Sequence, residues 1–164
     1  DLANIVVSPI GSASTTIGYA IGCINGGRIW YSTNSGVTWA VTTLNGGTAT
    51  NTWTNVAISS NAKYGVAIGN SGTIYICSNI TSGTTPNWIT SSSTLTAATV
   101  ASMSNTGQYI VVAGSGAIIY STNYGISWTQ VATPVTFQCI SMSRNGQYVF
   151  AANGTNIYRC IATN

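Results

Sequence analysis

Few side chains in this chain could do acid–base or metal chemistry. Its 164 residues include four Lys or Arg, one Asp or Glu and no His, which gives a formal net charge of +3. The whole charged set is Asp1, Arg28, Lys63, Arg144 and Arg159. General acid–base catalysis uses His, Glu, Asp, Lys, Tyr or Cys with a tuned pKa. Because most of these types are missing or rare, the sequence predicts that the chain is not an enzyme.

Common catalytic and metal sites also lack their residues. Paired-carboxylate glycosidases need two acids and a Ser-His-Asp triad needs a His, but this chain has a single acid and no His. Calcium sites use several carboxylate oxygens. Zinc would depend on cysteines, which show no short paired spacing: Cys23, Cys77, Cys139 and Cys160. We therefore expect no catalytic residue, no cofactor and no metal.

The four cysteines are expected to be free thiols, buried or half-buried. Cys77 and Cys160 occupy equivalent positions of the repeat described below, so they should lie on different sheets. Cys139 and Cys160 should lie two strands apart, roughly 9–10 Å, which is too far for a disulfide. A bridge from Cys23 to the last repeat across a closed ring is the alternative.

The remaining composition favours a packed β-protein that neither binds nucleic acid nor inserts into a membrane. The basic residues are scattered, whereas phosphate binding needs clustered Lys and Arg. No apolar run approaches the roughly 20 residues of a membrane-spanning helix. The opening DLANIVVSP has no initiator Met and no signal-peptide pattern, which suggests a processed chain or a segment of a longer one. Evenly spaced Ile, Val, Tyr and Trp favour strands.

One motif recurs along the chain. It reads IIYSTNYGISW at Ile118–Trp128 and IWYSTNSGVTW at Ile29–Trp39. A longer copy, IYICSNITSGTTPNW, occupies Ile74–Trp88, and a fourth begins at Ile157 as IYRCIATN and reaches no Trp. Each full copy is typical of a strand, a polar turn with Asn, and a second strand led by Trp.

A longer repeat surrounds this motif. Ser59, Ser104 and Ser143 mark one position of it, with successive separations of 45 and 39 residues. Periods of about 40–50 residues made of short strands are typical of propeller blades. We predict an all-β fold of β-propeller blades, each a four-stranded antiparallel sheet. The single domain or segment, 1–164, would hold about four repeats, at approximately 4–53, 54–98, 99–136 and 137–164, with the last incomplete.

The copies STNSGVTW and STNYGISW resemble the Asp-box, or bacterial-neuraminidase repeat, Ser-x-Asp-x-Gly-x-Thr-Trp, with Asn at the Asp position. Such repeats are found in sialidases, sortilin-like receptors and photosystem II assembly-factor-like propellers, including those of large DNA viruses. The resemblance implies a structural turn between the third and fourth strands, whose tryptophans bury against the neighbouring sheet. The residues that would form it are Ser32, Asn34, Gly36, Trp39, Ser121, Asn123, Gly125 and Trp128. A sialidase site would also need a Glu, which the chain lacks.

The number of blades leaves two alternatives open. Three repeats are complete, and the fourth ends before its last strand. The chain is either a compact four-bladed ring with one incomplete blade, or four consecutive blades of a larger propeller. Because open sheet edges promote association, we favour a fragment of, or a subunit within, a larger assembly.

Aromatic side chains among Asn, Thr and Ser could contact a ligand, because sugars stack on aromatic faces and bind amides and hydroxyls. The candidates are Trp53, Trp88, Tyr124 and Trp30. Packing in the core is the competing interpretation. The sequons at Asn79 and Asn153 permit glycosylation on a secretory route.

The sequence thus predicts a non-enzymatic structural or adhesion module on a virus particle or cell exterior. It would act by packing against other protein subunits, since interfaces are depleted in Lys and Glu. One alternative is a lectin-like propeller that binds glycans. Another is an assembly factor that docks onto a larger complex. Neither nucleic acid nor membrane insertion is expected.

Overall fold

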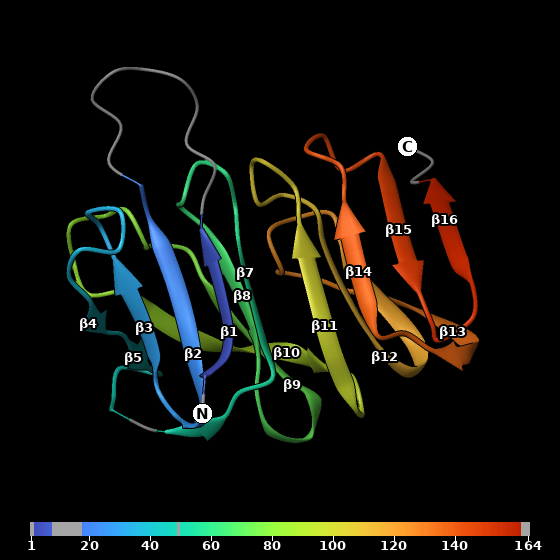
Figure 1. Ribbon diagram of the computed structural model, residues 1–164, viewed down its shortest axis with the longest axis horizontal. Coiled ribbons are helices and arrows are strands. Elements are labelled where there is room, and N and C mark those ends of the chain that lie inside the picture. Colours follow the sequence, from blue (N-terminus) through green and yellow to red (C-terminus); the bar gives the residue numbers. More distant parts are fainter. Residues whose placement is uncertain (1, 8–17, 49, 162–164) are drawn as a thin grey trace.

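The structure is a computed structural model that describes residues 2–7, 18–48 and 50–161. These residues form an all-β fold of four small antiparallel sheets, arranged as the four blades of a β-propeller (Figure 1). The prediction of fold class is confirmed. The one helical element among them is a short 3₁₀ turn, η1 (Asn70–Gly72), between two strands of the second blade.

Blades 1 and 2 are linked through their outer strands. Blade 1 has the strand order β1 (Leu2–Val7), β2 (Ala20–Gly27), β3 (Ile29–Ser32) and β4 (Ala40–Val41), and β6 (Asn51–Thr52) also pairs with β2. Blade 2 runs β7 (Asn55–Ile58), β8 (Gly65–Ile68), β9 (Thr73–Cys77) and β10 (Asn87–Thr94). The short β5 (Thr43–Leu44), which follows blade 1, pairs in parallel with β10.

Blades 3 and 4 differ in their outer edge. Blade 3 consists of β11 (Ala98–Met103), β12 (Ile110–Ser121) and β13 (Thr129–Thr136). The long β12 covers both the second and third strand positions of the repeat, with β11 paired to its first half and β13 to its second. Blade 4 consists of β14 (Cys139–Met142), β15 (Tyr148–Ala152) and β16 (Ile157–Ile161). Within the described residues, β16 has no outer partner strand.

Three apolar cores lie between successive blades. The first contains Ile21, Val56 and Trp88, the second Val66, Ile110 and Ile119, and the third Ala113, Phe137 and Ala151. Because a fully buried Val, Ile or Phe side chain contributes about 1.5–3 kcal/mol, these contacts between blades are a major stabilising element of the fold.

Polar contacts repeat across the same junctions. The Oδ1 atom of Asn55 accepts from the Ala101 N–H at 3.3 Å, and the Ser102 hydroxyl accepts from the Met142 N–H at 3.1 Å. The backbone N–H of Asn105 donates to the Arg144 carbonyl at 2.7 Å. These contacts fix the register of each blade against the next.

A tyrosine at the start of the second strand also contacts the turn of the following blade. A Cβ added at Gly107 would clash with Tyr64, and one added at Gly146 would clash with Tyr109. Both glycines also have a positive φ, of 80° and 78°, which other residues rarely adopt. The two turns therefore require glycine for two separate reasons.

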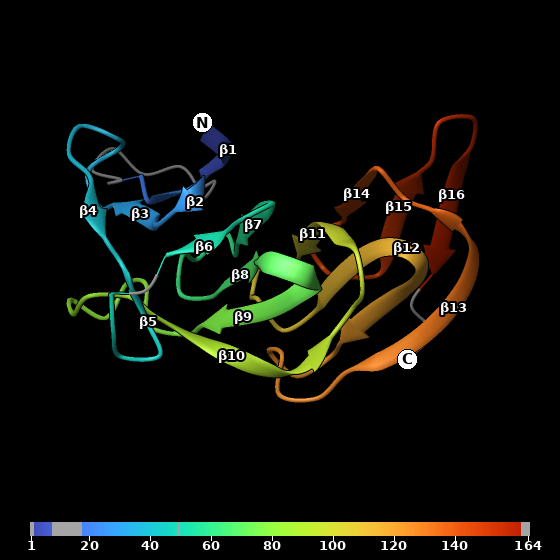
Figure 2. The same cartoon turned by 90° about the horizontal axis from the view of Figure 1, so that it is seen from below.

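The blades follow one another in a fan (Figure 2). Contacts run in series from β1 and β2 to β7, from β7 and β8 to β11, and from β11 to β14. Blades 1 and 4 stand at opposite ends of the longest axis (Figure 1). The two outer blades therefore each have one sheet face turned away from the other three.

Candidate functional site

The two box turns, Ser32–Trp39 and Ser121–Trp128, have the same hydrogen-bond network. In the second, the Ser121 hydroxyl accepts from the Gly125 N–H at 2.8 Å and donates to Asn123 Oδ1 at 3.0 Å. That Asn oxygen also accepts from the Ser127 N–H at 2.9 Å. The first turn repeats these bonds from Ser32 and Asn34 within 0.1 Å. The uncharged Asn side chain thus accepts the hydrogen bonds that hold the turn. The Ser and Asn side chains of both turns therefore have a structural role.

The longer copy in blade 2 uses a thiol in place of the serine. The thiol of Cys77 donates to Asn79 Oδ1 at 3.1 Å, and the same oxygen accepts from the Asn87 N–H at 3.0 Å. In the other sequon, Asn153 Oδ1 accepts from the Asn156 N–H at 2.7 Å. Both sequon asparagines therefore use their side chains to hold a turn.

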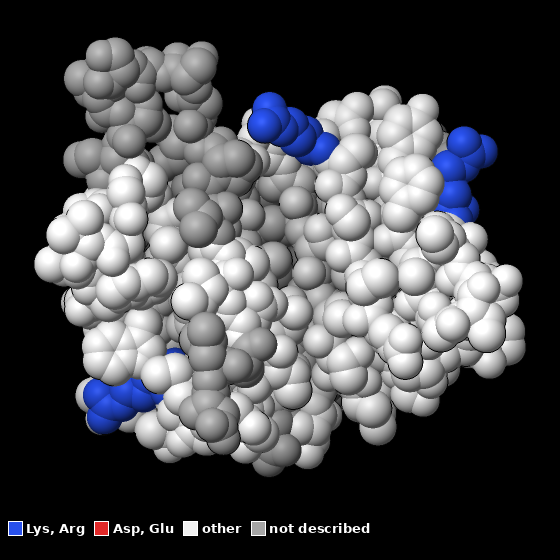
Figure 3. Space-filling model, in the orientation of Figure 1, with Lys and Arg blue, Asp and Glu red and all other residues white. Residues whose placement is uncertain are grey.

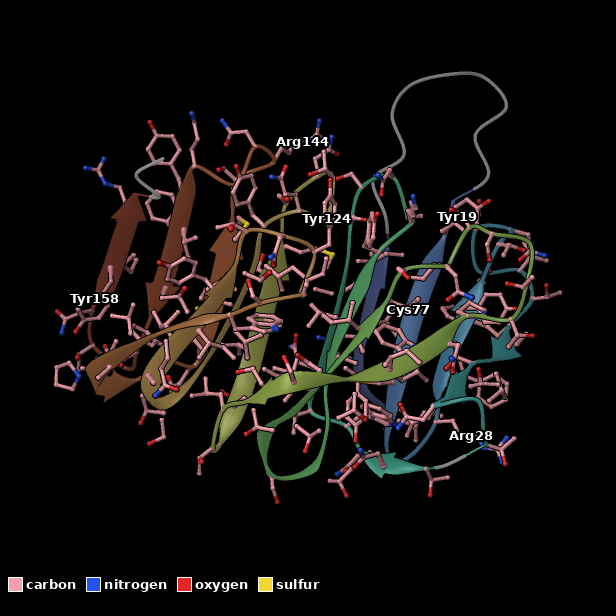
Figure 4. The ribbon with its side chains drawn as sticks, turned by 180° about the vertical axis from the view of Figure 1, so that it is seen from behind. Tyr19, Arg28, Cys77, Tyr124, Arg144 and Tyr158 are labelled. Atoms are coloured by element: carbon pink, nitrogen blue, oxygen red, sulfur yellow. The ribbon has the colours of Figure 1, made fainter. Side chains whose placement is uncertain are left out.

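The four predicted ligand contacts are not brought together. Trp53 and Trp88 are 2% and 1% exposed, and the Trp53 indole N–H donates to the Gly27 carbonyl at 3.2 Å. Such burial does not fit contact with a ligand. Trp30 is half-buried on β3 of blade 1. Tyr124 lies in the box turn of blade 3 (Figure 4). Its ring stacks on that of Tyr64 in blade 2, with centroids 4.7 Å apart.

The box tryptophans behave differently from one another. Trp128 is half-buried against the second core, and its indole N–H donates to the Gly125 carbonyl and to the Ser91 hydroxyl. Trp39 was expected to bury as well, but it is 37% exposed. The reason is that blade 1 has no preceding blade among the described residues against which Trp39 could pack.

Thiols and charges form no cluster in the described part of the chain. Cys23 and Cys77 are buried free thiols, and burial raises the pKa of each to about 11. Cys139 is free but exposed, contrary to the expected burial, because it lies on the outer face of blade 4. The side chain of Cys160 lies outside the described residues. No group of three metal-ligating residues occurs within the described ranges.

The basic side chains are spread over the surface (Figure 3). In Figure 4, Arg144 lies at the upper edge of the molecule and Arg28 at its lower edge. Asp1, the single acidic residue of the sequence, lies outside the described residues. No helix in residues 2–7, 18–48 and 50–161 has the length and apolarity to cross a membrane.

The outer face of blade 4 exposes several large apolar side chains. Strand register places Tyr148, Phe150 and Ile157 on the face opposite the third core, and their exposed fractions are 42%, 47% and 80%. Cys139, Ser141 and Arg159 complete this face, which we call the blade 4 face. An exposed apolar cluster of this kind, with Arg159 as its one charged residue among those described, typically marks an interaction site.

Two hollows lie elsewhere on the molecule. The blade 3–4 cavity, of about 700 Å³, is lined mainly by apolar and aromatic side chains of blades 3 and 4, among them Ile118, Tyr120, Val131, Val149 and Tyr158. The blade 1–2 cavity, of about 450 Å³, lies between the first box turn and the longer turn of blade 2. Its lining includes Tyr19, Tyr31, Trp39, Thr38 and Thr84. Sequence patterns had singled out neither hollow, because each combines residues far apart in the chain.

Comparison with known proteins supports the fold alone. No protein-family model and no curated protein matches the chain. Of the solved structures, 389 chains match. One is an ancestral GH74 enzyme, with a TM-score of 0.70 and 16% identity over 96% of this chain. The match covers 22% of that enzyme, so this chain spans about a fifth of its length. The shared fold is the β-propeller.

This comparison overturns the prediction that the chain is not an enzyme, because a protein with the same fold is a glycoside hydrolase. The prediction relied on a count of ionisable groups over 164 residues. Such a count is a poor guide to activity for a chain that matches about a fifth of an enzyme's length. At 16% identity the likeness extends to the fold and to no reaction or substrate.

Proposed function

We propose that this chain is a structural module that assembles by packing propeller blades face to face, with the blade 4 face as its contact surface. The observation that carries the proposal is a difference in exposure at equivalent repeat positions. Phe150 is 47% exposed, while Val66 and Val111 are 0% and 2% exposed. In blades 2 and 3 the following blade covers this position. Within residues 2–7, 18–48 and 50–161, no further blade covers the same position of blade 4.

The partner we propose is blade 1 of a second copy. Its own outer face, opposite the first core, carries Ile5, Trp30 and Val41, which strand register places on one side of the sheet. Ile5 is 47% exposed, whereas Val56 at the equivalent position of blade 2 is 1% exposed. Both ends of the fan thus have the residues of a junction between blades. Their pairing would be head to tail, a heterologous contact that forms rings or filaments.

Charge is compatible with this pairing. The blade 4 face has one charged residue, Arg159, which pairs in register with Phe150. The described residues of the blade 1 face have none. Interface cores are poor in Lys and Glu but tolerate Arg. The Asp-box-like repeats and a location on a virus particle or cell exterior agree with an assembly role and stay part of the proposal.

A substitution on the blade 4 face tests the proposal. Wild-type chain should show a mean mass in sedimentation velocity that rises with concentration above the monomer mass of 16.9 kDa. Phe150→Asp should stay at the monomer mass, because a carboxylate would be buried in the contact. Val37→Asp, at a position 79% exposed in the box turn of blade 1, is the matched control and should associate like wild type. A monomeric wild type at every concentration would overturn the proposal.

A second candidate function is glycan binding in the blade 1–2 cavity. Its lining combines Tyr19, Tyr31 and Trp39 with threonine hydroxyls and has no charged side chain. Aromatic faces and hydroxyls of this kind suit sugar rings. Glycan-array binding that is saturable and lost in Trp39→Ala, but kept in Val37→Ala, would favour this function. Trp53→Ala would be a poor test, because Trp53 is buried.

A further inference from the structure

The blade 3–4 cavity lies where the two preceding junctions hold a tryptophan. In the first junction, Trp88 of blade 2 is 1% exposed and belongs to the first core. In the second, Trp128 of blade 3 packs against the second core. At the third junction, residues 157–161 begin a fourth copy of the motif, and the described residues leave a cavity of about 700 Å³.

The lining of this cavity corresponds to the surface that receives Trp128. On blade 2, the Ser91 hydroxyl accepts from the Trp128 indole N–H at 2.9 Å. Ser91 is the third residue after Trp88, and the third residue after Trp128 is Val131, which lines the cavity. The surface of blade 3 that lines the cavity is therefore equivalent to the surface of blade 2 that contacts Trp128.

A second position gives the same correspondence. A Cβ on Gly125 would come within 2.7 Å of Ile76, so the box turn of blade 3 packs against Ile76 of blade 2. Ile76 precedes Asn79 by three residues, and Tyr120 precedes Asn123 by three. Tyr120 lines the cavity and is 39% exposed. At two positions, the cavity lining is therefore equivalent to the surface of blade 2 that contacts the box turn and Trp128 of blade 3.

The neighbouring strand edge lacks a partner as well. β10 pairs with β9 and β13 pairs with the second half of β12. In blade 4, the outer edge of β16 has no strand beside it in the described part of the chain. Such an edge presents backbone N–H and C=O groups that can pair with an added strand. In blades 2 and 3, one segment supplies both the tryptophan that packs at the junction and the outer strand, β10 or β13. In blade 4, the described residues supply neither.

We propose that blade 4 binds, by strand addition, a polypeptide segment that has an Asn-x-Gly turn, a Trp and then an extended strand. The Trp would fill the blade 3–4 cavity, and the strand would pair with β16. Because the cavity lining is largely apolar and aromatic, the segment should be uncharged, as Ser121–Thr136 is. This site faces blade 3, so it is separate from the blade 4 face and does not depend on the association of copies.

A peptide from the chain itself tests the site. The probe is a fluorescein-labelled STNYGISWTQVATPVT, the sequence of residues 121–136, added to the full chain and followed by anisotropy. We expect saturable binding that weakens at least tenfold when the peptide Trp is replaced by Ala, because a buried aromatic anchor usually dominates such contacts. Binding that is equal for both peptides, or absent at millimolar concentration, would overturn the proposal.

Variants of the protein locate the peptide. Val131→Asp should abolish binding, and this position is 49% exposed, so the fold should tolerate the change. Val131→Ser reproduces Ser91 and should retain or strengthen binding, since a hydroxyl could accept from the indole N–H. Val37→Asp is the matched control on blade 1. Phe150→Asp should bind the peptide normally, which separates this site from the blade 4 face; equal binding by Val131→Asp would contradict the assignment.

Discussion

The middle strands of blades 3 and 4 have similar sequences and opposite surroundings. Blade 3 reads YIVVA at residues 109–113 and blade 4 reads YVFAA at residues 148–152. In blade 3 both faces are covered, and Val111 and Val112 are 2% and 0% exposed. In blade 4 the burial alternates, with Phe150 at 47% and Ala151 at 1%. The sequence of the end blade is therefore that of an interior blade.

This difference shows that burial here depends on neighbouring blades rather than on the strand. A strand with one solvated face usually alternates apolar and polar residues, whereas one buried on both faces is apolar throughout. β15 is apolar throughout, as a strand buried on both faces would be, although one of its faces is exposed. Pairs of substitutions at equivalent positions of the interior and end blades test whether burial depends on the neighbouring blades.

The largest effect is expected at the isoleucine that opens the third strand. Ile74 in blade 2 is 0% exposed and Ile157 in blade 4 is 80% exposed. Ile74→Ala should lower the free energy of unfolding by about 2–5 kcal/mol, and Ile157→Ala should change it by less than about 0.5 kcal/mol. Urea unfolding below the concentration of association measures both. Equal losses would show that blade 4 is covered even in the monomer.

A smaller difference is expected between the turn serines. The Ser104 hydroxyl, in a buried residue of blade 3, accepts from the Tyr109 N–H at 3.1 Å. Ser104→Ala should cost about 1–3 kcal/mol, because this buried donor loses its partner. Ser143→Ala, in an exposed turn bond of blade 4 to the Tyr148 N–H, should cost less than about 1 kcal/mol. Thermal unfolding of both variants provides the test, and the reverse order would contradict it.

Thiol reactivity should distinguish the exposed blade 4 face from the buried interior of blades 1 and 2. At pH 8 a maleimide should label Cys139 quickly, while buried Cys23 and Cys77, whose pKa burial raises to about 11, should react only on unfolding. Cys139→Ser is the control and should remove the fast label. Between pH 9 and 11 the unfolded thiols ionise while the folded ones stay protonated, so stability should fall as pH rises. Fast labelling of Cys77 in the native chain would contradict the burial.

The smallest effect is expected from pH near neutrality. With no His and one acid in the sequence, few groups titrate between about pH 5 and 7. The melting temperature should stay nearly constant across this range. A steep change would reveal an ionisable partner that the chain itself does not contain.

Much of the fold could be predicted from the sequence, because repeats of Asn-Gly turns and apolar strands impose local structure. The repeat predicted at approximately 137–164 contains all three strands of blade 4, β14, β15 and β16. The faces of the strands were harder to assign, since residues in continuous apolar runs such as YVFAA do not show which side is covered. Trp53 was a candidate ligand contact because of the polar residues around it in the sequence, but its ring packs on Tyr75, with centroids 5.1 Å apart, in the first core.

The candidate sites were less accessible to sequence reasoning. The sequence predicted that the fourth repeat is incomplete within residues 1–164. The cavity itself depends on Tyr120 and Val131 of one blade and Tyr158 of the next. Only the packing of successive blades brings these residues together.

The central claim, that the two end faces pair head to tail, is tested most directly by mixing two variants. Ile5→Asp disables the blade 1 face and Phe150→Asp disables the blade 4 face, so each variant alone should be a monomer of 16.9 kDa. An equal mixture should form a 1:1 dimer and nothing larger, since each chain keeps a single intact face and the two remaining faces are the complementary pair. A mixture that stays monomeric while wild type associates would contradict head-to-tail pairing.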